Sequence, residues 1–370
     1  MSVKRVLVFL FLMLWILESH AVAHKSHAIM YKPKICIIAT GGTIAGMASS
    51  ITEAAYNPAQ LTVETLIAQV PEITERAHIT GLQLCNIASQ HITVDLWIRM
   101  AQVIDSLFIH SLCDGVVITH GTDTMEETAF FLDLILRHNK PVVFTGSMRP
   151  ANNLGADGPA NLYNAVCLAT EPSAGTMGVL AVMNDYIFAA SEFTKMNTVN
   201  PHAFESPDFG PMGTVRGGRV QFFRTQALGA KTALKCTTEQ LKQLAQDLQR
   251  GVFPRVEIVA SYADAPSTAL DALLASGVDG IVIAGVGHGN YSRPIEASIY
   301  NCLEQGVFVV RATRASQGGV TYGVEDPFAG QLVSGMLSPQ KARILLMLAL
   351  TRYRSLEELE TIFNDYSASH

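Results

Sequence analysis

Short apolar runs alternate with amphipathic stretches along the first half of the chain. From residue 33 to about 185, runs rich in apolar and β-branched residues are bounded by turn residues, and they read KICIIAT, DGVVITHG, KPVVFTG and MGVLAVMND. Between these runs, apolar positions recur three and four residues apart, which predicts helices over 94–108 and 124–138. Asp123 followed by Glu126 predicts the start of the second helix, and the sequence NKP predicts its end. Strands that are apolar throughout are typical of a parallel sheet with helices on both faces.

A shorter version of this alternation begins near residue 254. It comprises RVEIVASY, TALDALLAS, DGIVIAGVGHG, a further helix and GVFVVRAT, followed by the helical stretches SPQKARILLMLALTRY and SLEELETIFNDY. Residues 186–253 differ, because they contain a predicted hairpin that turns at Gly217-Gly218 and a Gln-rich helical stretch. The sequence therefore predicts a two-domain α/β protein. Its parts are a larger N-terminal domain with a mostly parallel, doubly wound sheet (33–225), a linker (226–253) and a smaller C-terminal α/β domain (254–370).

The first residues have the pattern of a targeting segment. Lys4 and Arg5 precede an apolar run over 6–17, and the small-x-small pattern Ala21-Val22-Ala23, which a signal peptidase accepts, follows it. The run is short for a membrane span, and a retained N-terminal anchor is the alternative. We expect residues 1–23 to be a cleavable signal peptide, and the mature protein to be periplasmic or secreted and without a membrane partner.

Composition narrows the range of functions. The chain has 370 residues, of which 49% are hydrophobic and 16% charged, and this fits a well-packed enzyme. The net charge is −6 and basic residues do not cluster, so nucleic acid is not expected as a partner. The six cysteines are scattered without a CxxC pair, so no metal site is predicted. Cys36 and Cys167 lie within apolar patterns and are predicted to be core residues.

Two of the predicted strands end in a threonine. Thr43 follows ATGG, and Thr122 follows ITHG. In open α/β sheets, ligands gather beyond the carboxyl ends of the strands, so both hydroxyls could face one crevice. The glycines before Thr43 allow a tight turn, but the GxGxxG and GK[ST] spacings of nucleotide loops are absent, so no cofactor is expected. From the local residues alone, Thr43 is as consistent with a turn residue that caps a helix as with a nucleophile.

Two charged residues could act at the same crevice. Asp123 is consistent with a helix cap and equally with a partner for a substrate ammonium. Lys195, in EFTKMNT, follows the fourth strand and would be either a base near Thr122 or a solvated surface lysine. The spacing of these residues leaves both alternatives open.

The motifs ATGGTIAG and ITHGTDTMEETAFFLDL, with DGPANLYNAV, GVGHGN and SPQKARILLMLALT, closely resemble those of bacterial L-asparaginases, especially the exported high-affinity type. The resemblance extends from about residue 33 to 366. It implies hydrolysis of the side-chain amide of L-asparagine to L-aspartate and ammonia through a threonine-bound acyl intermediate. A glutaminase-asparaginase that also acts on L-glutamine shares every motif, because one methylene is worth only about 1–3 kcal/mol of discrimination. An asparaginase-like amidotransferase subunit and a non-catalytic amino-acid-binding protein are further alternatives.

The resemblance also implies roles in catalysis for individual residues. Thr43 matches the nucleophile, and Tyr56 matches the tyrosine of the lid over the active site. The second group that it implies consists of Thr122, Asp123 and Lys195, which activates the attacking species in one half-reaction. Glu325 matches a catalytic residue that a neighbouring subunit contributes. No cofactor and no metal is implied.

A further set of residues is implied to bind the substrate. A free amino acid is a zwitterion, so its site must offer an acceptor to the ammonium and neutral donors to the carboxylate. The implied residues are Ser89 and Gln90 for the α-carboxylate, Thr122 and Asp123 for the amide and the ammonium, Ser147 for the side-chain amide, and Asn290 from a neighbouring subunit. The resemblance thus implies at least a dimer, and a homotetramer built from dimers that share active sites is the expected assembly.

The sequence departs from the exported relatives at one pair of positions. Those relatives often carry a disulfide where this chain has His110 and His138, so that bridge is expected to be missing and Cys113 to stay unpaired. The two histidines are then either a polar surface pair or a metal pair.

Overall fold

Alternate side chains of the first strand enter two separate cores. In β1 (Lys34–Gly41), Ile35 and Ile37 pack in one apolar cluster, whereas Cys36 and Ile38 pack in another. Every residue of β1 after Lys34 is buried, as expected for a strand covered on both faces. The computed structural model describes residues 31–52, 56–58, 60–227, 234–323 and 330–366, and Pro33–His370 form one compact unit.

β1 belongs to an eight-stranded sheet in the order β12-β11-β8-β7-β6-β5-β1-β4. The strands from β4 to β7 run parallel, whereas β8, β11 and β12 are antiparallel to their neighbours. The other strands of this sheet are β4 (His78–Ile87), β5 (Gly115–Thr119), β6 (Val142–Thr145), β7 (Val179–Met183), β8 (Tyr186–Ala189), β11 (Gly213–Arg216) and β12 (Arg219–Phe222). The mostly parallel sheet that the apolar runs predict is therefore confirmed.

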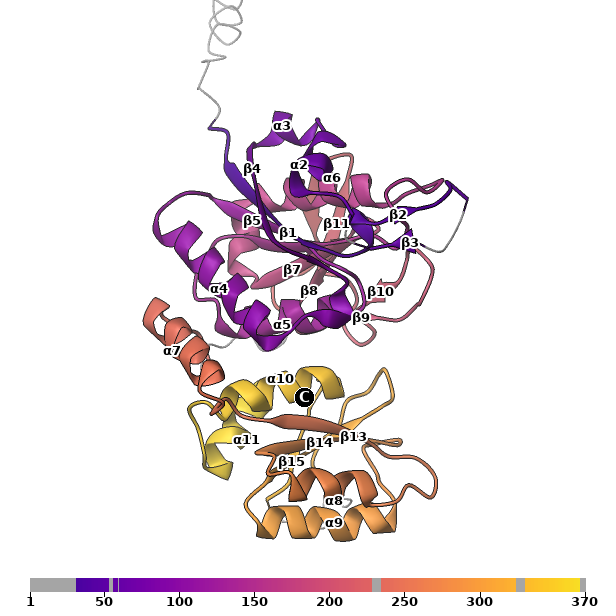
Figure 1. The fold of residues 1–370 in the computed structure, drawn as a ribbon, viewed down its shortest axis with the longest axis vertical. Helices are drawn as coiled ribbons and strands as arrows, with labels where there is room; N and C mark the ends of the chain where they lie inside the picture. The colour runs from indigo at the N-terminus through magenta and orange to yellow at the C-terminus, as the bar shows by residue number, and fades with distance from the viewer. Residues whose placement is uncertain (1–30, 53–55, 59, 228–233, 324–329, 367–370) are drawn as a thin grey trace, which may run out of the picture. The chain divides into compact units, whose positions relative to one another are not determined.

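Helices cover both faces of this sheet (Figure 1). On one face, α4 (Val94–Ile109) and α5 (Met125–Ile135) share a core with Cys36 and Ile38. On the other face, the core with Ile35 and Ile37 includes residues of α2 (Val63–Ala68), α3 (Ile73–Arg76) and α6 (Gly158–Ala169). This double cover explains why the strands lack the alternation of apolar and polar residues that a half-exposed sheet shows.

A second, smaller parallel sheet has the order β13-β14-β15-β16. Its strands are β13 (Val256–Ala260), β14 (Gly280–Gly285), β15 (Phe308–Thr313) and β16 (Leu332–Val333). Ile281 and Ile283 of β14 share a core with α8 (Thr268–Ala275) and α9 (Arg293–Glu304), whereas Val282 packs in the cluster that contains α10 (Pro339–Ala349) and α11 (Leu356–Asn364). The same cluster includes residues of α5, so helix α10 joins the apolar cores of the two sheets.

The range predicted to be a linker contains a well-formed helix. Helix α7 (Thr238–Gln249) starts with a capping box in which the side chain of Thr237 and that of Gln240 each accept from the other residue's main-chain N–H. It packs on α4, where Gln102 Nε2 donates to the carbonyl of Leu241 over 3.3 Å. The division of the chain at residues 226–253 stays a prediction. None of the helices in the described ranges is long and apolar enough for a bilayer crossing.

Two details of the predicted helix over 124–138 are wrong. The helix starts with Thr124 as its N-cap, so Asp123 does not cap it. It ends at Ile135, because Leu136 is extended and the carbonyl of Ile135 accepts instead from the main-chain N–H of Cys236 over 2.8 Å. The boundary is therefore set by a contact with a segment distant in sequence.

The two histidines at the positions of the relatives' disulfide have separate partners. His138 Nε2 lies 2.6 Å from Oδ1 of the buried Asp105, whereas His110 Nδ1 lies 2.9 Å from the carbonyl of Ser106. Cys113 is a free, buried thiol. Among the described residues, no group of three or more His, Cys, Asp or Glu side chains is arranged to hold a metal ion.

Candidate active site

The chain segments that follow β1 and β5 are in direct contact. The two strands pair in parallel, with Ala39 opposite Thr119. A Cβ on Gly42 would lie 2.4 Å from the Cα of Gly121, which is too close for any side chain. Gly42 also has a φ of 80°, a value that favours glycine. The residues that come next are Thr43 and Thr122, so both threonines emerge at the same rim of the sheet.

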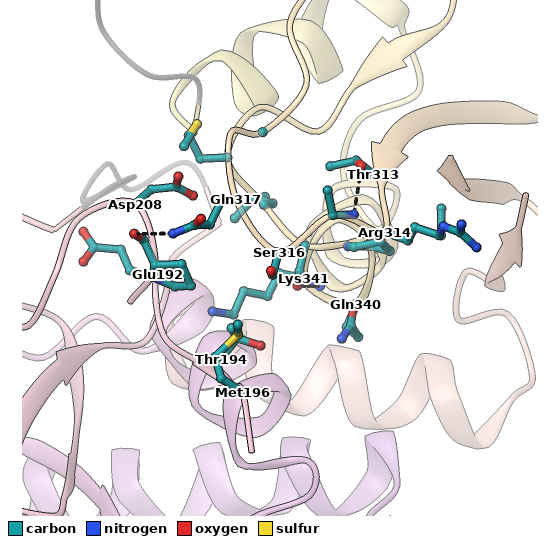
Figure 2. Close-up of a pocket in the computed structure, with 18 of the residues that line it drawn as sticks. Glu192, Thr194, Met196, Asp208, Thr313, Arg314, Ser316, Gln317, Gln340 and Lys341 are labelled. Atoms are coloured by element: carbon teal, nitrogen blue, oxygen red, sulfur yellow. Dashed lines mark hydrogen bonds between the residues drawn. The ribbon is translucent and has the colours of Figure 1, made fainter. Parts of the chain in front are cut away.

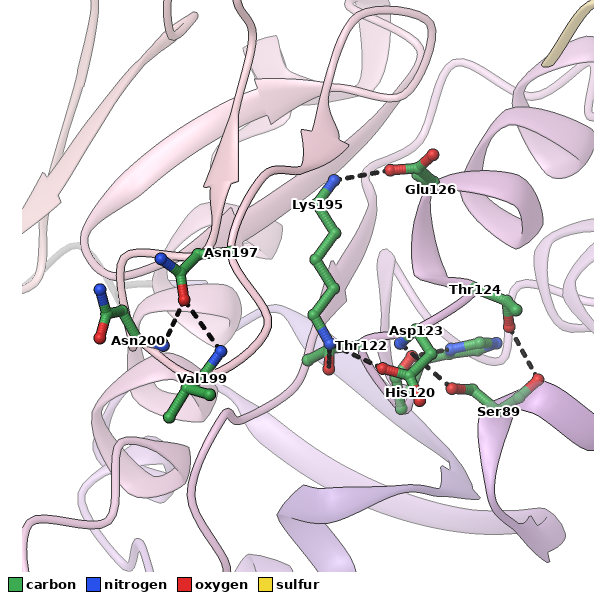
Figure 3. Close-up of polar contacts among 11 residues, drawn as sticks. Ser89, His120, Thr122, Asp123, Thr124, Glu126, Lys195, Asn197, Val199 and Asn200 are labelled. Carbon is green, nitrogen blue, oxygen red and sulfur yellow. Dashed lines mark hydrogen bonds and ion pairs between the residues drawn. The ribbon is translucent and has the colours of Figure 1, made fainter. Parts of the chain in front are cut away.

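A lysine amine contacts the second threonine and the aspartate beside it. Lys195 Nζ donates to Thr122 Oγ1 over 2.8 Å and lies 2.6 Å from Asp123 Oδ1 (Figure 3). Thr122 is buried, the side chain of Lys195 is 17% exposed, and that of Asp123 is 61% exposed. The Asp123 carboxylate can therefore contact a ligand from solvent while it still contacts the lysine.

Ser89 contacts the loop that carries Thr122, Asp123 and Thr124. It begins the 3-10 helix η2 (Ser89–His91), is buried, and its Oγ accepts from the main-chain N–H of Asp123 over 3.2 Å. Its carbonyl accepts from the hydroxyl of Thr124 over 2.8 Å. Gln90 is exposed next to it. The two residues implied to bind the α-carboxylate thus lie at the loop that carries Asp123.

The loop after β6 also reaches Thr122. A Cβ on Gly146 would lie 3.5 Å from Thr122 Cγ2, which places the main chain there beside the threonine. Ser147 follows and is fully buried, and its Oγ donates to the carbonyl of Arg149 over 2.8 Å. The hydroxyl of Ser147 is thus used within the loop.

The sequence did not identify His120 as a site residue, but its side chain bonds to the main chain of the loop that carries Thr122. His120 is completely buried, and burial lowers its pKa to about 4, so the ring is neutral at pH 7. Its Nδ1 lies 2.7 Å from the carbonyl of Gly121, which can only accept, so Nδ1 carries the proton. Nε2 then accepts from the hydroxyl of Thr128 over 3.0 Å, and that hydroxyl in turn accepts from Trp97 Nε1 over 2.8 Å. A polar residue at the end of an apolar strand was the available signal.

The structure does not bring all predicted residues to this group. Thr43 is buried in the 3-10 helix η1 (Thr43–Ala45), and Tyr56 begins the short strand β3 (Tyr56–Asn57). Asn290 is exposed after β14, where its main chain bonds to that of Val286. Glu325 lies outside the described residues.

Two cavities adjoin the Lys195 segment. One, of about 310 Å³, is lined by Asp123, Glu126, Thr194, Lys195, Met196, Asn197, Thr198 and Gln340. A larger one, of about 430 Å³, is lined by residues such as Glu192, Asp208 and Lys341 (Figure 2). The residues that line both cavities are Thr194, Lys195, Met196 and Gln340. Asn290 lines neither cavity. The smaller cavity is lined by Asp123, whose carboxylate is the acceptor that a substrate ammonium needs. We therefore regard this cavity as the entrance to the site.

Both halves of the chain match models of known protein families. The family model "Asparaginase, N-terminal" matches residues 34–228, and "Glutaminase/Asparaginase C-terminal domain" matches residues 255–363. The chain is 40% identical to L-asparaginase 2 of Escherichia coli, over 92% of this chain and 95% of that protein. It is also 40% identical to glutaminase-asparaginase of Acinetobacter glutaminasificans, over 90% of this chain and 100% of that protein.

A solved structure gives the same result for the fold. The crystal structure of a probable cytoplasmic L-asparaginase from Campylobacter jejuni superposes with a TM-score of 0.84 at 38% identity, over 90% of this chain and 100% of that chain. The two family models together cover the strands of both sheets, and helix α7 lies between the matched ranges. The resemblance seen in the motifs is therefore confirmed, and the chain belongs to the asparaginase family.

Proposed function

We propose that the protein is an L-asparaginase, which hydrolyses the side-chain amide of L-asparagine to L-aspartate and ammonia. The observation that carries this proposal is the contact of one amine, Lys195 Nζ, with both Thr122 Oγ1 and Asp123 Oδ1 at the rim of the large sheet. Relatives that cover nearly the whole chain are named L-asparaginase and glutaminase-asparaginase. L-glutamine is therefore the alternative substrate.

Substrate binding follows from the charges at this rim. The exposed carboxylate of Asp123 is the acceptor for the α-ammonium. Ser89 Oγ and the amide of Gln90 are the neutral donors for the α-carboxylate, and the main chain at Ser147 contacts the side-chain amide. In this arrangement the reacting amide carbon lies between the loops that carry Thr43 and Thr122.

The reaction is an acyl transfer in two halves. The hydroxyl oxygen of Thr43 forms a bond to the amide carbon, the carbon–nitrogen bond breaks, and ammonia leaves after it gains a proton. Water then attacks the ester, which releases L-aspartate and returns the proton to Thr43. A threonine hydroxyl is a poor nucleophile until its proton is removed, and Lys195 with Thr122 provides a route for that proton. Main-chain N–H groups of the glycine-rich loops would stabilise the oxyanion.

The complete site requires a second subunit in this proposal. Asn290 and Glu325 would come from a neighbouring copy, in a dimer or a tetramer built from dimers. Asn290 is exposed and lines neither cavity beside Lys195, which supports this reading. Mixed dimers of Thr43→Ala and Asn290→Ala subunits would test it, because one active site in such a dimer regains both residues and activity returns on mixing.

The proposal also covers the export of the protein and the boundaries of its two domains. We propose that residues 1–23 are removed as a signal peptide, and these residues lie outside the described part of the structure. Sequencing the N-terminus of protein recovered outside the cytoplasm tests the cleavage. The domain boundaries at 33–225 and 254–370 can be tested by limited proteolysis within 226–253.

The proposed function is tested by ammonia release from L-asparagine and from L-glutamine, each at micromolar concentration, with the purified mature chain. We expect release from L-asparagine with a kcat/KM at least equal to that for L-glutamine. A higher kcat/KM for L-glutamine would make the alternative substrate the main one. No release from either amide would contradict the proposal.

A further inference from the structure

A buried carboxylate holds the main chain of the lysine at the site. Glu126 is only 4% exposed and lies in the first turn of α5, four residues after Thr122. Its Oε2 accepts from the main-chain N–H of Lys195 over 2.7 Å (Figure 3). Its Oε1 accepts from Gln340 Nε2 of helix α10 over 3.4 Å. A carboxylate is retained in an interior only when such partners satisfy it.

A buried lysine accompanies this carboxylate. Lys341, the residue after Gln340, is 2% exposed, and its Nζ donates to the carbonyl of Phe193 over 2.5 Å. Burial lowers the pKa of Lys341 to about 8, while the nearby carboxylates, Glu126 first among them, favour its charged form. The segment from Phe193 to Lys195 is thus bonded at one end to Lys341 and at the other to Glu126.

The bonds from Glu126 and Lys341 matter because the segment from Phe193 to Lys195 forms only a short strand. Strand β9 (Thr194–Lys195) has two residues and, within the described residues, pairs with β10 (Phe204–Glu205) in a two-stranded sheet, where Lys195 is opposite Phe204. A ladder of that length restrains a strand weakly. The bond from Lys195 N–H to Glu126 instead ties the lysine to the helix that begins just after Thr122 and Asp123. Main chain and amine of Lys195 are therefore both held by the same loop and helix.

We propose that Glu126 is a positioning residue for the hydrolysis: its carboxylate, supported by Gln340 and Lys341 of α10, fixes the main chain of Lys195 so that Nζ stays within hydrogen-bond distance of Thr122 and Asp123. This inference rests on the proposed function, because Lys195 matters only if it moves a proton there. It assigns to α10 a role within the same chain, separate from any residue that a neighbouring subunit contributes.

Glu126→Ala, Glu126→Gln and Glu127→Ala test the proposal. Glu127 is the next residue, is half-buried, interacts with Arg343, and does not line the cavity beside Lys195, so it is a matched control. Because a misplacement of about 1 Å can lower a rate about a hundredfold, we expect Glu126→Ala to lower kcat for L-asparagine roughly tenfold to hundredfold, with KM changed less than about threefold. Glu126→Gln keeps an acceptor for the N–H of Lys195 and recovers most of kcat, and Glu127→Ala stays within about twofold of wild type.

A double-mutant cycle with Lys195→Met separates positioning from general stability. If Glu126 acts through Lys195, Glu126→Ala changes the residual kcat of the Lys195→Met protein less than about twofold. An equal fold-loss in both backgrounds, or a wild-type kcat in Glu126→Ala at a temperature well below its Tm, would overturn the inference. If Glu126→Ala fails to fold, the same cycle is run with Glu126→Gln, for which a smaller loss that disappears in Lys195→Met is expected. A wild-type protein without ammonia release would overturn the proposed function itself, which is a distinguishable result.

Discussion

The Cα of Gly121 occupies the space that a side chain on Gly42 would need, since a Cβ there would lie only 2.4 Å away. This contact joins the loops after β1 and β5, and each loop continues directly into a threonine. Gly121 also lies close to a substrate-binding candidate, because a Cβ on Gly121 would lie 2.7 Å from Ser89 Oγ. The geometry of the site therefore depends on two backbone segments that carry no side chain.

Gly121→Ala is expected to separate the two loops. The new methyl group would meet Ser89 Oγ at 2.7 Å and Gly42 Cα at 3.2 Å, so the backbone must shift, at a cost of about 1–3 kcal/mol in the free energy of unfolding. We expect kcat/KM for L-asparagine to fall about a hundredfold, because the reacting groups are misplaced. Steady-state kinetics and urea unfolding measure the two effects.

The control for this variant is Gly277→Ala. A Cβ at that position meets nothing within 4 Å, but the φ of 74° makes alanine strained. Its unfolding free energy should fall by about 1 kcal/mol with kcat/KM unchanged. If Gly121→Ala loses stability but retains full activity, the loop contact does not organise the site.

Asp123→Asn tests the assignment of the ammonium partner. The amide keeps the shape of the side chain but removes the charge that faces solvent, and it weakens the contact with Lys195. We expect the Kd for L-aspartate, measured by calorimetry, to rise tenfold to hundredfold, or about 1.4–2.8 kcal/mol. The Tm should change little, because the side chain is 61% exposed. An unchanged Kd would mean that another acidic group binds the amine.

The buried His120 predicts a dependence of stability on pH. Its pKa is lowered from 6.5 to about 4 by burial, so below pH 6.5 the unfolded chain binds a proton that the folded chain does not. Stability from the neutral ring is complete above pH 6.5 and is lost as the pH falls towards 4. At pH 4.5 the loss amounts to about 2.5 kcal/mol.

Urea unfolding of wild type and His120→Gln at pH 7 and pH 4.5 measures this contribution. The difference in unfolding free energy between the two pH values should be smaller in His120→Gln by about 2.5 kcal/mol. His202→Gln is the control, because the side chain of His202 is 53% exposed and its removal should leave the difference as in wild type. Equal pH differences in all three proteins would contradict a buried, neutral His120.

Elements with a strong local signal were predictable from the sequence. β1 and β5 are mostly apolar, which indicates strands buried on both faces. α4 has apolar positions at helical spacing, which indicates a helix with one buried side. Strands β4 and β8 were not predicted. β4 lies at the edge of the sheet and is half exposed, with Thr80 and Gln83 on its surface, so the apolar run is missing.

The site was predictable in its residue types and only partly in its contacts. From the local residues, Asp123 was as consistent with a helix cap as with a substrate-binding residue. Its contact with Lys195, 72 residues away along the chain, exists because β9 lies next to the loop after β5. Glu126 likewise bonds to the main-chain N–H of Lys195, and because every residue except proline has this group, the residue types of β9 do not indicate the bond. Contacts of this kind depend on tertiary structure, and a periodicity in the sequence does not report them.

The most direct test of the account is the identity of the acylated residue. Mature protein mixed with L-asparagine is quenched with acid within the first turnovers, digested, and its peptides are examined by mass spectrometry for an aspartyl ester. The account predicts an ester on the peptide that contains Thr43, and its absence from a Thr43→Ala protein that still binds L-aspartate. An ester on Thr122, or ammonia release by Thr43→Ala at the wild-type rate, would contradict it.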